Sequence, residues 1–370
     1  MLDADDLVPA LATLAATLIA LYVAGYFATA PRAAGAGKVT SIVVYPLKSA
    51  KGVAVQSARL DARGLEYDRL WMVVDENGSF LSQRRAPKLA LVEAKLPNSP
   101  DEPLQLSAPG AKPLRVPVVR TSSAAPAQVR VWDARPAAVD QGDEAGKWFE
   151  AVLGVEGARL VRMADDAQRV VDQKYAPRGA TTAFSDGFPL LLANEASLSQ
   201  LNEKLTARGK TTIPMDRFRP NLVIGGGAPG ENGAPPFAED AWSAISVGVR
   251  NVTFGIVKPC ARCKMPTIDQ ATGVPDGRAT ACSTKGTADD DDEGGGPTAE
   301  AEPTATMRTF RTGRLLGYRK PGWADDVFFG QNLVLRAHAG AVVAVGDAVL
   351  ATPKRPRGWF GRGTRGVDYF

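Results

Sequence analysis

The chain has 370 residues, of which 45% are hydrophobic and 23% are charged, a composition typical of a folded globular protein. Its net charge of +4 gives no indication of nucleic-acid binding. A single histidine, His338, argues against Ser-His-Asp or Cys-His catalysis and excludes a zinc centre built on several histidines. Three cysteines, an odd number, argue against a disulfide-stapled secreted fold.

The N-terminus contains an apolar run, residues 7–28, that has no charged residue and is long enough for a transmembrane helix. Acidic residues precede this run, while Arg32 and Lys38 follow it, so the positive-inside rule places the rest of the chain on the cytosolic side. A cleaved signal peptide is the alternative, because residues 28–30 read ATA, but the acidic start favours a retained anchor. We therefore expect residues 1–38 to be a membrane anchor and tether.

The first part of the following region consists of short β-like runs. One run spans residues 39–46, and residues 70–83 predict two strands joined at Asn77-Gly78, a dipeptide typical of hairpin turns. Residues 113–119 predict a further strand, and Pro117 favours an edge position for it.

Two helices are predicted. The first spans residues 143–153, because its apolar residues share one face and Gly154 is a typical C-terminal cap. The second spans residues 194–205, with Asn194 as its N-cap.

Further strands are predicted at residues 221–227, 245–257 and 329–351. Residues 225–236 form a Gly- and Pro-rich loop. Residues 283–304 are acidic and lack bulky apolar side chains, which predicts a disordered insert, and residues 354–370 are expected to form a basic flexible tail. The fold class is therefore a β-rich α+β protein, with one domain at residues 39–157 and a second at residues 158–353.

The stretch VKPCARCKMP, residues 257–266, carries Cys260 and Cys263. Completing a zinc site would require Cys282 and His338, and Cys282 adjoins the acidic insert. A redox pair favours a helix start, which Pro266 opposes. A plain buried thiol is the remaining simple interpretation, so the residues alone leave these alternatives open.

Basic residues recur in short motifs beside Pro, Gly or predicted strand ends. If these residues are spread over the surface, they only keep it polar and hydrated. If several of them come together in the fold, they create an anion site that is suited to phosphate. Next to a thiol, such a site would suit a metal carried by a phosphorylated organic ligand. The basic residues concerned are Lys48, Arg69, Arg84, Arg85, Arg217 and Arg219.

Six motifs occur in the order found in MOSC-domain proteins. They are VTSIVVYPLKSAKGVAV, DRLWMVVDENGSFLSQRRAPKLALV, FSDGFPLLLANEASLSQLN, DRFRPNLVI, CARCKMPTIDQATG and FGQNLVL. Over residues 39–350 the chain resembles the mitochondrial amidoxime reducing component group of this family. The resemblance implies a MOSC N-terminal β-barrel-type domain followed by a β-barrel-like MOSC domain.

The resemblance also implies a molybdenum cofactor (Mo-molybdopterin), with Cys263 as both the catalytic residue and the protein ligand of the metal. Two positions depart from the family: Ala261 replaces an expected serine and Gly187 replaces a hydroxyl residue. The implied cofactor-binding residues are Lys48, Ser49, Arg84, Ser185, Asp186, Arg219, Asn221, Ala261, Arg262 and Cys263.

The implied reaction is the reduction of N-hydroxylated compounds such as amidoximes and hydroxylamines, with nitrite as a further candidate. The resemblance implies that electrons come from NADH through cytochrome b5 reductase and cytochrome b5. The sequence has no haem, flavin or Rossmann signature, which agrees with the need for such a partner. The resemblance places the anchor in the mitochondrial outer membrane, with a monomeric soluble domain facing the cytosol. The alternatives are a molybdenum cofactor carrier or sulfuration-related protein, and a membrane-tethered adaptor without catalysis.

Overall fold

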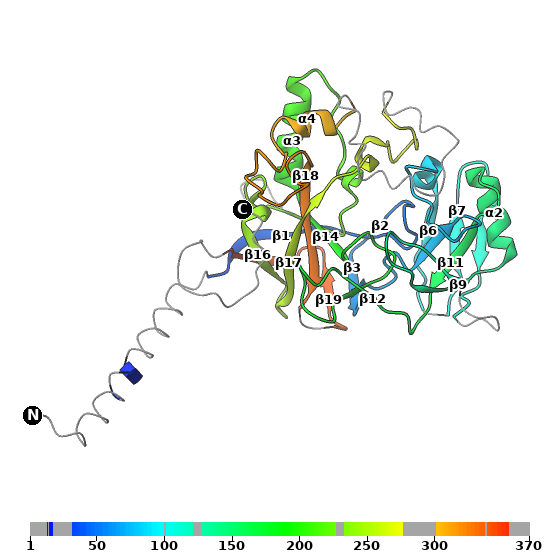
Figure 1. The fold of residues 1–370 in the computed structure, drawn as a ribbon, viewed down its shortest axis with the longest axis horizontal. Coiled ribbons are helices and arrows are strands. Elements are labelled where there is room, and N and C mark those ends of the chain that lie inside the picture. The colour runs from blue at the N-terminus through cyan, green and yellow to red at the C-terminus, as the bar shows by residue number, and fades with distance from the viewer. Residues whose placement is uncertain are drawn as a thin grey trace, which may run out of the picture.

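The structure consists of two lobes, shown in Figure 1. On one side lie the strands β6 (Glu93–Lys95) and β11 (Arg159–Met163), and on the other the strands β16 (Trp242–Val247), β17 (Val252–Ala261) and β18 (Phe328–Leu335). The structure is a computed structural model that describes residues 13, 15–17, 32–99, 101–120, 127–226, 233–276, 301–336 and 339–354. Most of the expected anchor at residues 7–28, together with Cys282, His338 and the basic tail beyond residue 354, lies outside the described residues. None of the helices in the described part combines the length and the hydropathy that a membrane crossing requires.

The larger lobe is built on a closed β-barrel. Seven of the described strands form its ring, because β1 pairs with β20 on one side and with β15 on the other, while β2 extends the sheet at β1. Only the β14–β15 pair in this ring is parallel. In order around the ring, with β2 last, the strands are β15 (Leu222–Gly225), β14 (Leu190–Asn194), β18 (Phe328–Leu335), β17 (Val252–Ala261), β16 (Trp242–Val247), β20 (Ala348–Pro353), β1 (Ala34–Val44) and β2 (Val53–Val55).

The barrel core is aliphatic and includes Val39, Ile42, Ile245 and Leu333, which are all at most 1% exposed. Two short helices pack against the outside of the ring, near the top of the view in Figure 1. They are α3 (Glu195–Ala207) and α4 (Thr304–Arg308). Short elements around the barrel are β3 (Ser57–Asp61), β4 (Gly64–Leu65), β12 (Arg169–Val170), β13 (Thr181–Thr182), β19 (Val342–Ala344), η2 (Met215–Phe218), η3 (Ala238–Ala241) and η4 (Met265–Thr267).

The described part of the smaller lobe contains two small antiparallel sheets, one α-helix and one 3-10 helix. One sheet has the order β5-β11-β10-β9 and the other β6-β7-β8, and Phe149 of the helix α2 is fully buried against the second sheet. The elements are β5 (Trp71–Val74), η1 (Pro87–Leu91), β6 (Glu93–Lys95), β7 (Leu104–Ser107), β8 (Leu114–Val116), β9 (Ala127–Gln128), β10 (Ala137–Asp140), α2 (Asp143–Leu153) and β11 (Arg159–Met163).

Local sequence signals predict several elements correctly. Helix α2 has the predicted bounds and ends at Gly154, which adopts the left-handed conformation. Helix α3 begins after Asn194, whose side chain accepts a hydrogen bond from the backbone N–H of Ala196. β8 is an edge strand, as Pro117 predicts.

Two local predictions need correction. The turn at Asn77-Gly78 forms, but its second strand is reduced to a single bridge between Val74 and Phe80, because the chain turns away after Ser82. The end of the predicted disordered insert is structured: Ala301 and Thr304 are each 1% exposed where they enter α4. At Ala301 and Thr304, burial in the folded structure therefore prevails over the disorder that the polar composition of residues 283–304 predicts.

Barrel closure depends on Gly37 in β1. This residue has a φ of +102°, and a Cβ built on it would lie 2.2 Å from the backbone oxygen of Gly225 in β15. The close approach occurs next to the register shifts that let β1 pair with both neighbours. A side chain at this position would separate the two strands that complete the ring.

We predict that Gly37→Ala lowers the free energy of unfolding by about 3 kcal/mol or more, because it combines backbone strain with a steric clash. Gly110→Ala is the matched control, since Gly110 has a φ of +75° and no atom within 4 Å of its built Cβ. The control should cost only about 1 kcal/mol. Urea denaturation of both variants measures the difference, and equal losses would show that the contact with β15 is unimportant.

Candidate functional site

A polar pocket lies where loops of the two lobes meet, and it contains about 410 Å³ of space that is partly open to solvent. The loop after β1, the loops on both sides of β5, the loop before β14, the turn after η2 and the segment after β17 all contribute to it. The lining residues are Lys48, Ser49, Arg69, Phe80, Ser82, Arg84, Ser185, Asp186, Arg219, Cys263 and Met265.

The pocket loops hold an unusual backbone conformation. Ser49, Arg69 and Arg219 have φ values of 66°, 49° and 55°, in the left-handed region that residues other than glycine rarely adopt. Such strain persists only where the surrounding structure enforces it, and it is concentrated at functional sites. Three strained residues in one pocket therefore single out this place in the fold.

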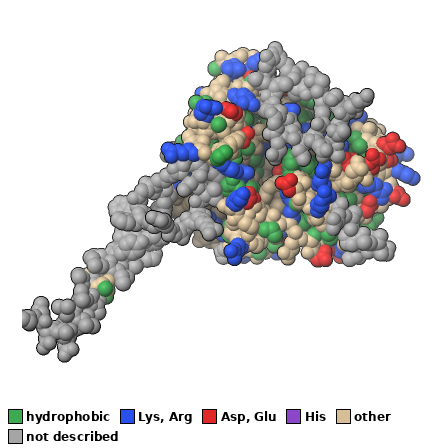
Figure 2. All heavy atoms as spheres, in the orientation of Figure 1, with side chains coloured by type: hydrophobic (Ala, Val, Ile, Leu, Met, Phe, Trp, Pro, Cys, Tyr) green, Lys and Arg blue, Asp and Glu red, His purple; other side chains and the backbone are tan. Residues whose placement is uncertain are grey.

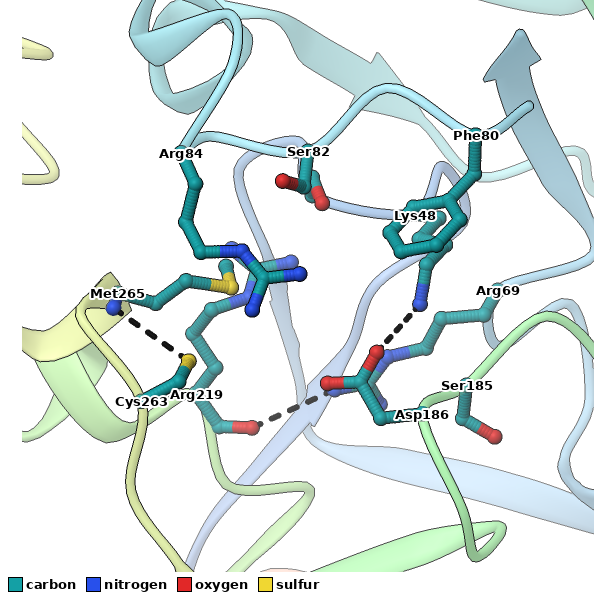
Figure 3. Close-up of a pocket in the computed structure, with 11 residues that line it drawn as sticks. Lys48, Arg69, Phe80, Ser82, Arg84, Ser185, Asp186, Arg219, Cys263 and Met265 are labelled. Atoms are coloured by element: carbon teal, nitrogen blue, oxygen red, sulfur yellow. Dashed lines mark hydrogen bonds and ion pairs between the residues drawn. The ribbon is translucent and has the colours of Figure 1, made fainter. Parts of the chain in front are cut away.

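Lys48 and Asp186 form an ion pair across the pocket, with 2.6 Å between Nζ and Oδ1 (Figure 3). Burial lowers the pKa of Lys48, and the carboxylate of Asp186 opposes that effect. Burial by itself would raise the pKa of Asp186, but Lys48 and then Arg84 outweigh it and hold that pKa well below its usual range. The carboxylate of Asp186 is therefore ionised at neutral pH.

Arg169 holds the loop that carries Asp186. Its guanidinium donates to the backbone oxygens of Ala183, Ser185 and Asp186, the last at 2.6 Å. Burial lowers the pKa of Arg169. This buried arginine fixes the position of the loop without entering the pocket.

The ring of Tyr45 contacts two pocket cations. The guanidinium carbons of Arg69 and Arg219 each lie 4.3 Å from the centre of this ring, and Tyr45 is 2% exposed. Burial lowers the pKa of Arg219 to about 10, with Arg69 adding to the effect. Burial also raises the pKa of Tyr45 to about 12, so the phenol stays neutral and donates to the backbone oxygen of Pro220.

Asn221 lies behind the pocket and is fully buried. Its Oδ1 accepts hydrogen bonds from Arg69 Nη1 and from the N–H of Leu191, and its Nδ2 donates to Asp68 Oδ1 and to the backbone oxygen of Val43. All of its hydrogen-bonding capacity is used inside the protein, so Asn221 orients Arg69 and Asp68.

Two pocket arginines have no acidic partner. Within the described part of the chain, Arg84 and Arg219 make no ion pair, and their side chains make no hydrogen bond. In Figure 3 both guanidinium groups lie on the side of the pocket near Cys263 and Met265. Unpaired guanidinium groups directed into a shared space are suited to binding an anion.

The two cysteines of the C-x-x-C stretch have different surroundings. Cys263 lines the pocket, where its sulfur accepts from the N–H of Met265 at 3.5 Å. Cys260 does not line it, and its sulfur instead lies 3.0 Å from Nη1 of Arg262. Both thiols are free, and among the described residues no three His, Cys, Asp or Glu side chains come together as a metal-binding group.

The remaining two candidates lie outside the pocket lining. Ala261 is exposed at the end of β17. Arg262 points toward Cys260 and donates to the backbone oxygen of Phe218. The candidates that the structure does bring together are Lys48, Ser49, Arg84, Ser185, Asp186, Arg219 and Cys263.

Sequence reasoning missed three lining residues, Phe80, Ser82 and Met265. Arg69 was among the basic residues of the predicted anion site, although it was not among the implied cofactor-binding residues. Of the other basic residues, Arg85 pairs with Asp75, and Arg217 pairs with Asp269.

The donor set suits a phosphorylated anion next to a soft metal. Four cations and one carboxylate line the pocket, which leaves an excess of positive charge for a phosphate. The sulfur of Cys263 is a soft donor at the same pocket. The residues present therefore fit a metal that is held by a phosphorylated organic ligand.

On the face drawn in Figure 2, several Asp and Glu side chains gather at the edge of the smaller lobe, where Lys and Arg side chains also lie, and both kinds occur on the barrel lobe.

The family model of the MOSC N-terminal beta barrel domain matches residues 36–156, and that of the MOSC domain matches residues 180–350. Mitochondrial amidoxime-reducing component 1 of Mus musculus is 33% identical over 248 residues, which cover 65% of this chain and 68% of that protein. Mitochondrial amidoxime reducing component 2 of Bos taurus is 33% identical, with 65% and 69% covered. Molybdenum cofactor sulfurase of Danio rerio is also 33% identical, over 63% of this chain but only 28% of that protein.

We predict that Asn221→Ala lowers the free energy of unfolding by about 2 kcal/mol or more, because buried groups of Arg69 and Asp68 lose a partner. Asn98→Ala is the control, since Asn98 is exposed and, among the residues that the structure describes, its side chain bonds with Glu102. Urea denaturation measures both variants. Equal stability of the two variants would contradict the positioning role of Asn221.

Proposed function

The chain belongs to the MOSC-domain family that includes the mitochondrial amidoxime-reducing components, and we propose that it is a molybdenum-cofactor-dependent oxidoreductase that reduces N-hydroxylated compounds. The observation that carries the proposal is the convergence of two unpaired arginines with the sulfur of Cys263 in one pocket. Because one fold hosts many functions, this site supports the activity more directly than the barrel does.

The proposed cofactor site uses the pocket as the structure builds it. Arg84 and Arg219 would bind the cofactor phosphate, Lys48 and Ser49 would bind its polar edge, and Cys263 would ligate molybdenum. When bound, the molybdenum cofactor would supply the two-electron redox chemistry of the reaction.

The other proposed cofactor contacts divide into two groups. Ser185 and Asp186 line the same pocket, so their side chains can reach a ligand there. For Asn221, Ala261 and Arg262 we propose indirect support, because none of their side chains lines it. Asn221 orients Arg69, while Ala261 and Arg262 fix the backbone that leads to Cys263.

The chain's own residues bind and orient ligands in this proposal. Since the pKa of Asp186 lies well below its usual range, its carboxylate is ionised at neutral pH and cannot act as a proton donor there. Its role is to balance Lys48 and to limit the positive charge of the pocket. The protons that reduction of an N–OH group to water requires would then come from solvent at the pocket opening.

The electron source is proposed by family analogy. Cytochrome b5, reduced by NADH through cytochrome b5 reductase, would deliver electrons to the pocket. The mitochondrial names of the relatives support a mitochondrial location. Anchoring in the outer membrane through residues 7–28, with the two lobes facing the cytosol, is part of the same proposal.

A second candidate function is a molybdenum cofactor carrier or a sulfuration-related protein, which the match to the zebrafish sulfurase favours. That match covers 28% of the sulfurase, so most of that protein has no counterpart in the aligned region. Both candidates require the cofactor, and they differ in whether the loaded chain turns over substrate.

We predict that Cys263→Ala reduces the molybdenum content of the purified protein by about tenfold or more, because it removes a direct ligand. Cys260→Ala is the matched control and should retain the metal, since Cys260 lies outside the pocket lining. Metal analysis by mass spectrometry measures both. Loss of molybdenum from the Cys260 variant alone would make the ligand assignment wrong.

We further predict that the molybdenum-loaded chain reduces benzamidoxime when it is combined with cytochrome b5, cytochrome b5 reductase and NADH. Omission of cytochrome b5 should abolish turnover, since the sequence has no haem or flavin signature. Chromatographic detection of benzamidine measures the product. A fully loaded protein without turnover would favour the carrier function instead.

A further inference from the structure

Trp132 lies on a tight hairpin of the smaller lobe, between the bridged residues Val131 and Ala134. It has a φ of 53°, one of the seven positive values among the described non-glycine residues. Neither its ring nor its hairpin carries any role in the proposed cofactor site, and the residue does not line the pocket. A strained, partly exposed tryptophan next to a functional pocket calls for a physical explanation.

The ring of Trp132 supports Arg84. The guanidinium carbon of Arg84 lies 4.9 Å from the centre of the ring, within cation–π distance. Arg84 makes no ion pair in the described part of the chain. The cation–π contact with this ring is therefore an interaction that can hold its guanidinium in place. Stacking restricts a long flexible side chain without neutralising its charge.

The indole N–H of Trp132 contacts the opposite charge. Nε1 donates to Oδ1 of Asp186 at 3.3 Å, and the same oxygen accepts from Lys48 Nζ at 2.6 Å. This hydrogen bond is among the interactions that favour the carboxylate form of Asp186. One side chain therefore touches both a cation and the only carboxylate among the pocket-lining residues.

Phe80 extends the contact to a third charge. Its ring packs against Trp132 at 5.2 Å between centres, with an interplanar angle of 58°, and Lys48 Nζ lies 4.9 Å from its centre. The pair of Phe80 and Trp132 thus forms an aromatic wall that touches Arg84, Asp186 and Lys48. Figure 3 shows Phe80 above Lys48 and Asp186, with Arg84 on the other side of the pocket.

The arrangement has an electrostatic consequence. Arg84 already contributes to lowering the pKa of Asp186, so the two groups attract each other across the pocket. A direct Arg84–Asp186 ion pair would consume the carboxylate and turn the guanidinium away from a ligand. Trp132 contacts both groups and can hold them in separate positions.

We propose that Trp132 is a positioning residue that keeps Arg84 available for a phosphate-bearing ligand by stacking on its guanidinium and by holding Asp186 at Lys48. The inference rests on the proposed function insofar as that function makes the pocket a phosphate site. The proposal assigns a role in ligand binding to a residue of a hairpin that supplies none of the pocket-lining residues.

The test is a titration of the full-length, molybdenum-free chain with inorganic phosphate. Binding is measured by calorimetry and by the change in tryptophan fluorescence. Trp132→Phe keeps a ring beside Arg84 but loses the N–H, and we expect about threefold weaker binding. Trp132→Leu loses both interactions, and we expect binding to weaken by about tenfold. Trp148→Phe is the matched control, because Trp148 lies on α2 and bonds to the backbone oxygen of Lys112.

Fluorescence supplies a readout that a purely structural role would not change. Phosphate should alter the emission of the unaltered chain and of the Trp148 variant, and this change should be absent in Trp132→Phe. If Trp132→Leu fails to fold, the fluorescence and affinity of Trp132→Phe still decide the question.

Two results would overturn the inference: phosphate affinity of a folded Trp132→Leu protein equal to that of the unaltered chain, or no phosphate binding by the unaltered chain. The titration needs neither molybdenum nor turnover. A chain that binds phosphate as expected but carries no molybdenum would therefore refute the proposed function and leave the role of Trp132 supported.

Discussion

Like charges that are partly removed from water repel one another, and the arrangement of the pocket follows from this constraint. Burial lowers the pKa of Arg219 to about 10, with a smaller contribution from the neighbouring Arg69, which shows the cost of removing this charge from water and of placing it near another cation. Aromatic rings pack against the pocket cations, and a single carboxylate among the lining residues offsets part of their charge. Tyr45 contacts both Arg69 and Arg219, and Asp186 balances Lys48, which leaves positive charge for a ligand.

The barrel explains why residues distant in the sequence can form this pocket. Strand β1 closes the ring between β15 and β20, and the chain then leaves it directly into the loop with Lys48. β17 delivers Cys263 just beyond its end, and the turn before β15 delivers Arg219. A closed barrel has no free edge in its ring, so the strand ends that carry these loops are held rigidly. The strain at the left-handed residues is sustained by that rigidity.

Prediction succeeded where the determining physics is local. Gly154 ends α2 because only a residue without a Cβ adopts the left-handed conformation easily, and Asn194 caps α3 through its own side chain. It failed where tertiary contacts decide. The second strand of the expected hairpin shrinks to the bridge between Val74 and Phe80, and Ala301, within an acidic stretch, is buried at the entry to α4.

The sequence by itself determined two helices and part of the strands, the family to which the chain belongs, and a set of chemically suitable residues that includes both cysteines. Only the tertiary structure decided which of them share a space. Cys263 and Cys260 are three residues apart, yet one faces the pocket and the other Arg262, because the chain turns at the end of β17. Arg84 and Arg85 are adjacent, yet only Arg84 enters the pocket, while Arg85 pairs with Asp75. The direction of a side chain depends on backbone turns and on neighbours from distant segments, and these are absent from any local pattern.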